Sequence, residues 1–325
     1  TLHQQALFAQ VQGDIHLNMG DTTAAQTLYA AALRVEADRH GAWQPERVYL
    51  GLARCDFIQG DIAKAEQKAH TALDIAVVEN DPHNMLEASM LYGMAVADLG
   101  NVAEAHTRFT AALTLAQQLN NRMSEARALG ALGHIERDQR QAIAYYEASL
   151  EIWRKIGDKH SLAIETGNLG SVYQEVGQLE QAMACYRESR QMSEAMGDQL
   201  GTIFCDAKSA ELLCEQTKFD QSRPHWQQAL TTARAIASDY WLLYPLVGFA
   251  WLTIAHDPSQ AATYLALIEQ HQAANIETKR LIEKVRSYLP DQTVPKQIKL
   301  DFAQLIDSAE QCFRLRYIEH GGKNE

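Results

Sequence analysis

The chain has 325 residues, and its 41 acidic against 29 basic residues give a formal net charge of −12 at neutral pH. Hydrophobic residues make up 46% and charged residues 22%, which excludes a disordered chain. The acidic balance, without any run of Lys or Arg, argues against binding to nucleic acid or to an anionic membrane surface.

The cysteines and the apolar segments narrow the location of the protein. The five cysteines are widely spaced and include no CxxC pair, which is typical of isolated thiols in a reducing compartment. No apolar run approaches the ~20 residues of a membrane span, and no signal peptide is present. We therefore expect a cytoplasmic protein that does not bind a membrane. The chain begins at Thr1 instead of Met, as either a fragment of a longer protein or a processed chain would.

One small residue recurs along most of the chain, with steps of 40 residues and a single step of 37. The series is Ala25, Ala65, Ala105, Ala142, Ala182, Ser222 and Ala262. Four residues after each of these comes a second residue, in most cases aromatic. Those residues are Tyr29, Ala69, Phe109, Tyr146, Tyr186, Trp226 and Ala266. Residues four apart share one face of a helix, so the pattern predicts one helix that is repeated seven times.

A second helix is predicted upstream of each of these positions. A glycine precedes the small residue by five positions in four units, at Gly20, Gly60, Gly100 and Gly177, and predicts a tight turn between two helices. Another small residue stands twelve positions upstream, where the helices must approach closely. These residues are Gly13, Ala53, Gly93, Gly170, Ala210 and Ala250. In the fifth unit we expect Gly170 to contact Ala182.

Two units depart from the pattern. The fourth unit, "GHIERDQRQAIAYYEASL", lacks three residues and the turn glycine, which predicts a shorter first helix or a shorter turn. The seventh unit carries Pro245 inside its first helix, and Asp257 with Pro258 suits the start of its second helix.

The last part of the chain does not follow the repeat. "ANIETKRLIEKVRSYL" predicts one helix, "PDQTVPKQ" a linker, and "IKLDFAQLIDSAEQCFRLRYIE" an amphipathic helix. The apolar stripe of this last helix consists of Ile298, Phe302, Leu305, Ile306, Ala309 and Phe313. It can cap the last repeat, or it can dock a partner or a second copy as a dimerisation helix.

The predicted fold class is therefore all-α. A helical hairpin cannot bury its apolar face alone, so seven hairpins would stack into a right-handed α-α superhelix with a concave inner wall. We expect the array to cover residues 1–272, and residues 273–325 to supply the capping helix, the linker and the C-terminal amphipathic helix.

The unit resembles the tetratricopeptide repeat, whose pattern LGxxYxxxGxxxxAxxxYxxAL is matched at Leu169, Gly170, Tyr173, Gly177, Ala182 and Tyr186. The resemblance extends over roughly residues 3 to 270. Ordinary units have about 34 residues. The longer unit is similar to the repeats of kinesin light chains, of spindle-orientation adaptors, and of sensor domains in bacterial signalling ATPases and transcription activators.

The resemblance implies that the first helix of each hairpin lines the concave wall. The partner-binding residues expected there are Arg47, Arg54, Phe57, Glu87, Met90, Met94, Arg127, His134, Arg137, Ser171, Gln174 and Glu211. Glu175, Phe204 and Glu215 fall on the same wall. The arginines can clasp carboxylates or phosphates, or pair with acids of the next helix. The methionines can offer an adaptable apolar surface or pack in the core.

The sequence gives no support for catalysis. It contains no P-loop, HExxH, GxSxG, EF-hand or GxGxxG pattern, and no two of its twelve histidines are spaced for a metal on one helix turn. We expect no enzyme activity, no cofactor and no metal.

Three functions remain open. The resemblance favours a module that binds a peptide or protein partner, as the sensor or regulatory part of a larger bacterial signalling or transcription-regulating protein. The alternatives are sensing of a small sugar-type molecule, for which Tyr240, Trp241, Tyr244 and Trp251 form an aromatic cluster, and a structural adaptor.

Overall fold

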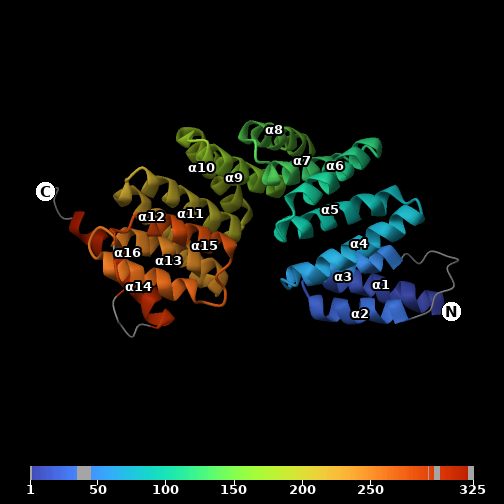
Figure 1. Ribbon diagram of the computed structural model, residues 1–325, viewed down its shortest axis with the longest axis horizontal. Helices are drawn as coiled ribbons and strands as arrows, with labels where there is room; N and C mark the ends of the chain where they lie inside the picture. The colour runs from blue at the N-terminus through green and yellow to red at the C-terminus, as the bar shows by residue number, and fades with distance from the viewer. Residues whose placement is uncertain (1, 35–44, 292, 296–300, 321–325) are drawn as a thin grey trace. The chain divides into compact units, whose positions relative to one another are not determined.

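The computed structural model describes residues 2–34, 45–291, 293–295 and 301–320, and this part of the chain is almost entirely helical (Figure 1). The chain divides into two compact units, Thr1–Gly157 and Asp158–Glu325. None of the helices in the described ranges is long and apolar enough to cross a membrane. The five cysteines all lie in the described part of the chain, and none of them forms a disulfide there.

The described residues of unit 1 form four helical hairpins. Their helices are α1 (Leu2–Asn18) and α2 (Thr22–Arg34), α3 (Pro45–Ile58) and α4 (Ile62–Val78), α5 (Pro82–Asp98) and α6 (Val102–Gln118), and α7 (Arg122–Ile135) and α8 (Gln139–Ile156). Each hairpin packs on the next, since α2 contacts α3, α4 contacts α5, and α6 contacts α7.

In unit 2, the part of the chain that the structure describes forms three hairpins and two further helices. The hairpins are α9 (Lys159–Glu175) with α10 (Leu179–Met196), α11 (Gln199–Glu215) with α12 (Phe219–Ala235), and α13 (Asp239–Thr253) with α14 (Pro258–Glu269), followed by α15 (Ile276–Arg286) and α16 (Phe302–His320). The all-α fold of about seven helical hairpins that the sequence predicts is confirmed.

The predicted turns within the hairpins are confirmed by the backbone. Gly20, Gly60, Gly100 and Gly177 have φ angles between +76° and +85°, in the left-handed region that favours glycine. Gly157 and Gly197 adopt the same conformation at the ends of α8 and α10. The chain can therefore reverse direction after each helix without steric strain at these positions.

Gly170 marks a close approach inside the fifth hairpin. A Cβ atom on Gly170 would lie 2.8 Å from Cε1 of Tyr186, closer than side chains tolerate. The three atoms nearest to that Cβ position belong to the Tyr186 ring and to Cys185. The fully buried Tyr186 ring lies across this position and fills the space that a Gly170 side chain would need.

The irregular units also differ from their neighbours as the sequence indicated. In the fourth unit α7 has 14 residues against 17 in α5, so the missing residues shorten the first helix. In the seventh unit Pro245 lies inside α13, and Asp257 caps α14 by accepting a hydrogen bond from the Gln260 amide at 3.0 Å. Pro258 occupies the first turn of α14, where no amide hydrogen is needed.

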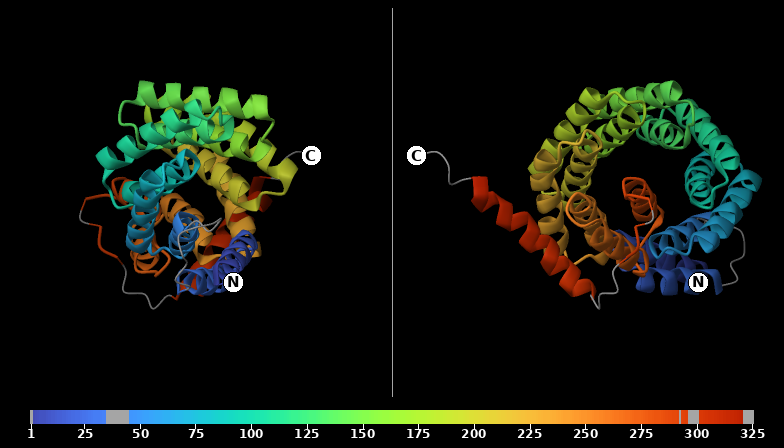
Figure 2. Two further views of the ribbon diagram at one scale, coloured as in Figure 1. Left: turned by 90° about the vertical axis from the view of Figure 1, so that its right-hand side faces the viewer. Right: turned by 60° about the vertical axis from the view of Figure 1, so that its left-hand side comes forward.

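The C-terminal helix α16, red in Figure 2, covers part of unit 2. It contacts α12, α13 and α14, with Leu305 and Ala309 fully buried and Phe302 and Ile306 partly buried against the same core. Ile298 and the Phe313 side chain lie outside the described residues. The described part of the apolar stripe therefore packs inside its own unit.

Candidate binding groove

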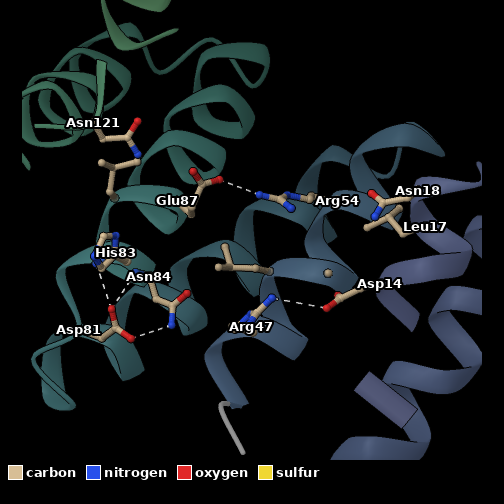
Figure 3. Close-up of a pocket in the computed structure, with 13 residues that line it drawn as sticks. Asp14, Leu17, Asn18, Arg47, Arg54, Asp81, His83, Asn84, Glu87 and Asn121 are labelled. Atoms are coloured by element: carbon tan, nitrogen blue, oxygen red, sulfur yellow. Dashed lines mark hydrogen bonds and ion pairs between the residues drawn. The ribbon is translucent and has the colours of Figure 1, made fainter. Parts of the chain in front are cut away.

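Two adjoining cavities open along one side of unit 1. The larger, of about 680 Å³, lies among α1, α3, α5 and the start of α7 (Figure 3). The smaller, of about 420 Å³, shares four lining residues with it: Leu17, Asn18, Arg54 and Glu87. We call the two cavities together the unit 1 groove. Seven of the predicted partner-binding residues line it, namely Arg47, Arg54, Phe57, Glu87, Met90, Met94 and Arg127.

The repeat explains why these side chains meet. Arg47, Glu87 and Arg127 stand one 40-residue step apart, on the first helices of three successive hairpins. Equivalent positions on stacked hairpins lie side by side, so basic, acidic and basic side chains alternate across the wall. Asp14 and Arg54 are related by the same step.

Glu87 is shared by two arginines. Its Oε2 atom lies 2.7 Å from Nη2 of Arg54, and its Oε1 atom lies 3.7 Å from Nη1 of Arg127. The side chains of Arg54 and Arg127 remain 46% and 42% exposed. A guanidinium has five N–H donors, and Glu87 engages only a few of the ten. Pairing within the wall and binding of a partner are therefore compatible for these arginines.

Arg47 has a similar position at the other end of the groove. Its Nη2 atom lies 3.6 Å from Oδ2 of Asp14, while Oδ1 of Asp14 accepts a hydrogen bond from the Tyr29 hydroxyl at 2.7 Å. Burial and the Asp14 carboxylate raise the pKa of Tyr29, so the hydroxyl stays protonated and donates. Arg47 keeps most of its donors and half of its side-chain surface exposed.

The acid at the start of α5 is fully engaged. Asp81 accepts hydrogen bonds from the amides of His83 and Asn84 at 3.0 and 3.1 Å, which caps the helix. The side-chain amide of Asn84, in turn, donates to Asp81 at 2.9 Å and to the buried Glu46 at 3.0 Å. Asp14, Asp81 and Glu87 thus each have at least one partner within the protein, and the arginines have donors left over.

The smaller cavity adds an apolar region. Phe57 and Met94 are partly buried, and Met94 packs against the core of unit 1. Met90 is only 3% exposed and belongs to that core, so its contribution to the groove is limited to one edge. An apolar group that enters here would meet Phe57, Met94 and the exposed Ile58.

Two predicted residues of unit 1 lie outside the groove. His134 is exposed near the end of α7 and lines neither cavity. Arg137 falls in the turn after α7, because the three missing residues end this helix early, and its side chain is exposed. The repeat register could not reveal whether the helix or the turn had lost these residues.

The predicted residues of unit 2 are engaged internally. The Tyr186 hydroxyl donates to Oε1 of Gln174 at 2.7 Å and lies 3.3 Å from Oγ of Ser171. Glu211 is 6% exposed instead of lining an open wall. The described residues contain no group of His, Cys, Asp and Glu side chains that could hold a metal ion.

Glu211 is the centre of a buried polar network. It accepts hydrogen bonds from the Tyr244 hydroxyl at 2.6 Å, from Lys284 at 2.6 Å and from Lys208 at 3.1 Å. Lys284 also pairs with Glu215. Burial opposes ionisation of Glu211, but the two ammonium groups outweigh it and lower its pKa to about 2.

Several groove residues escaped the sequence analysis. They are Asp14, Leu17, Asn18, Asp81, His83, Asn84 and Asn121. Asp81 and Asn121 stand one repeat apart and cap α5 and α7, the first helices of successive hairpins, with Asn121 accepting from the Ser124 backbone amide at 3.1 Å. A search for capping residues at the starts of the inner helices could have found both.

Comparison with known proteins now identifies the fold. Residues 124–195 match the family described as tetratricopeptide repeat. No curated protein matches the chain. The match, together with the solved structures below, confirms the resemblance of this chain to tetratricopeptide repeat proteins.

Solved structures extend the likeness over almost the whole chain. A Rap protein complexed with Competence and Sporulation Factor is 12% identical, with a TM-score of 0.70 over 98% of this chain and 86% of the other. NprR in complex with its cognate peptide NprX is 15% identical, with a TM-score of 0.59 over 98% and 92%.

A third structure is a Signal Transduction ATPase with Numerous Domains from Pyrococcus horikoshii that carries a tetratricopeptide repeat sensor. It is 14% identical, with a TM-score of 0.62 over 95% of this chain. This chain spans half the length of that protein. At these identities the likeness shows the fold.

Proposed function

We propose that the unit 1 groove binds an extended peptide, either free or as a segment of a protein partner. The observation that carries the proposal is the imbalance of hydrogen-bonding groups in an open groove. Arg47, Arg54 and Arg127 keep unused donors, while Asp14 and Glu87 already have partners. A peptide backbone carries one carbonyl acceptor per residue, and these carbonyls can accept hydrogen bonds from the unused N–H groups of the arginines.

The groove also indicates the composition of the peptide. A carboxylate can accept two parallel hydrogen bonds from one guanidinium, so an acidic side chain or a C-terminal carboxylate fits near Arg54 or Arg127. The neighbouring surface of Phe57 and Met94 suits an apolar side chain. The proposed ligand is therefore acidic at one point and apolar at a nearby point.

Two of the similar structures carry bound peptides or factors according to their descriptions, which supports a peptide ligand for this fold. We propose further that the chain is the non-catalytic sensor or regulatory part of a larger bacterial signalling protein in the cytoplasm, because a similar structure is a sensor attached to an ATPase. The acidic net charge favours a protein partner over nucleic acid or a membrane.

A peptide array tests the proposal. Short peptides that vary in acidic and apolar content are probed with the full chain and with the variant Arg47→Ala/Arg54→Ala/Arg127→Ala. The control variant Arg137→Ala/Arg140→Ala/Arg154→Ala removes the same charge from exposed positions outside the groove.

We expect acidic-apolar peptides to bind the wild type and the control, and to bind the groove variant about tenfold or more weakly, which corresponds to ~1.4 kcal/mol or more. Circular dichroism checks that all three proteins remain helical. Equal binding by both triple variants, or no binding of any peptide to the wild type, would contradict the proposal.

A further inference from the structure

Unit 2 contains a separate cavity of about 260 Å³, where α11, α13 and α15 lie side by side (Figure 1). Its walls are mostly aromatic and aliphatic. The apolar lining residues are Ile203, Phe204, Ala207, Tyr240, Trp241 and Tyr244. Tyr240 and Trp241 meet edge to face, with ring centroids 5.2 Å apart, which fixes two of the walls.

The polar groups at this cavity are mostly engaged with each other. The Tyr240 hydroxyl accepts a hydrogen bond from the Asn275 amide at 2.8 Å, and the Tyr244 hydroxyl donates to Glu211 at 2.6 Å. Lys208 donates one N–H to Glu211 and a second to the Tyr244 hydroxyl at 3.0 Å. An ammonium has three N–H groups, so one remains for a ligand.

The charges around the cavity balance. Lys208 and Lys284 face Glu211 and Glu215, and Arg280 pairs with the lining residue Glu277 at 2.7 Å. A charged ligand would lose its hydration on entry without gaining an unpaired opposite charge, which is unfavourable in an apolar site. The cavity therefore suits an uncharged ligand.

The size and the lining narrow the ligand class. An apolar cavity of about 150 Å³ is enough to hold benzene, so this larger one can accommodate a ring with a substituent. Each hydroxyl of a sugar would need a hydrogen-bonding partner. The Tyr244 hydroxyl donates to Glu211 and the Tyr240 hydroxyl accepts from Asn275, so the Tyr240 O–H and one N–H of Lys208 are too few for the several hydroxyls of a sugar. The lining thus favours an aromatic ligand over the sugar-type ligand considered from the sequence.

We propose that this cavity is a binding site for a small uncharged aromatic molecule that carries one hydrogen-bond acceptor. The ring lies among Phe204, Trp241 and Tyr244, and the acceptor atom receives the third N–H of Lys208. Residues from α15 complete the wall at Asn275, Glu277 and Thr278, so occupancy also holds α15 in place. The site is independent of the unit 1 groove.

Calorimetric titration of the full chain tests the proposal with three probes. Acetophenone has an uncharged ring and one carbonyl acceptor, benzoate has the same ring with a negative charge, and maltose is a sugar of the alternative class. We expect saturable binding of acetophenone, binding of benzoate about tenfold weaker or undetectable, and no binding of maltose.

Two variants locate the site. Ala207→Leu fills the cavity, and Phe204→Ala removes one wall, so each should weaken acetophenone binding about fivefold or more. Phe219→Ala is the matched control, because Phe219 is a partly buried phenylalanine of the same unit that does not line this cavity. If the filled variant unfolds by circular dichroism, Phe204→Ala still decides the outcome.

Hydrogen exchange gives a second readout that does not depend on affinity. Acetophenone should slow amide exchange in α15 in the wild type and leave it unchanged in Phe204→Ala. The proposal is overturned if acetophenone does not bind, if Phe204→Ala and Phe219→Ala bind it equally, if maltose or benzoate binds more tightly, or if the ligand speeds exchange in α15.

Discussion

Arg54 in unit 1 and Glu211 in unit 2 occupy the same position of the repeat, one residue after the small residue of the first helix, yet their environments are opposite. The Arg54 side chain on α3 is 46% exposed, lines the unit 1 groove, and pairs with Glu87 on α5. Glu211 is 6% exposed and receives hydrogen bonds from Lys208, Tyr244 and Lys284.

The position in the repeat alone therefore does not determine whether a residue of the inner wall is accessible to a partner. Accessibility also depends on whether a later segment of the same chain covers that position. In unit 2, Lys284 of α15 reaches back to Glu211 across 73 residues, whereas in unit 1 the corresponding surface lines a cavity of about 680 Å³. The Arg54 side chain therefore stays exposed, whereas the Glu211 carboxylate is covered by residues of its own unit.

The largest effect is expected from removing the buried acid. Glu211→Ala leaves the Lys208 ammonium group without its acidic partner and removes one of the two acids that pair with Lys284, which should lower the free energy of unfolding by about 3–5 kcal/mol. Arg54→Ala removes one exposed pair and should cost less than about 1 kcal/mol. Urea unfolding of both variants checks the comparison, and similar losses would show that the two sites do not differ in this way.

A pH titration sharpens the same contrast. Because the folded-state pKa of Glu211 is lowered from 4.5 to about 2, its contribution to stability is complete above pH ~4.5 and is lost as the pH falls toward 2. The loss from this group is on the order of 3 kcal/mol, at ~1.36 kcal/mol per pKa unit. Unfolding free energies of the wild type and Glu211→Gln, measured across this range, should converge at low pH. Parallel curves would contradict the assignment.

The contact between α15 and Glu211 can be removed by mutation. Lys284→Met removes the hydrogen bonds from α15 to Glu211 and Glu215, which should cost about 1–3 kcal/mol and speed amide exchange in α15. Arg280→Met on the same helix is the control, since Arg280 pairs only with its exposed neighbour Glu277 in the described structure. Equal exchange in the two variants would mean that Lys284 does not hold the helix.

The smallest effect on stability is expected for the partly exposed ion pair of Arg54 and Glu87. A double-mutant cycle on Arg54 and Glu87 should give a coupling energy of about 0.2–1 kcal/mol, because both side chains are partly exposed. Added salt should reduce it. A coupling energy above this range that persists in salt would indicate that the Arg54–Glu87 pair is buried. The contrast with the buried Glu211 network would then be wrong.

Much of the fold could be predicted from the sequence, since the 40-residue step fixed the hairpins and the glycine turns at Gly20, Gly60, Gly100 and Gly177. The candidate site could be predicted only in part. The burial of Glu211 depends on a contact with Lys284 that no local pattern encodes. The position of Arg137 outside the groove depends on whether the helix or the turn of the fourth unit is shorter.

The most direct test compares the two units with one ligand. Using the tightest peptide from the array, fluorescence anisotropy would give its dissociation constant for the wild type, for Arg54→Ala and for Lys284→Met. We expect Arg54→Ala to weaken binding about tenfold and Lys284→Met to leave it within about twofold. Weaker binding only in Lys284→Met, or an unchanged constant in Arg54→Ala, would contradict the claim that the ligand binds the open groove of unit 1.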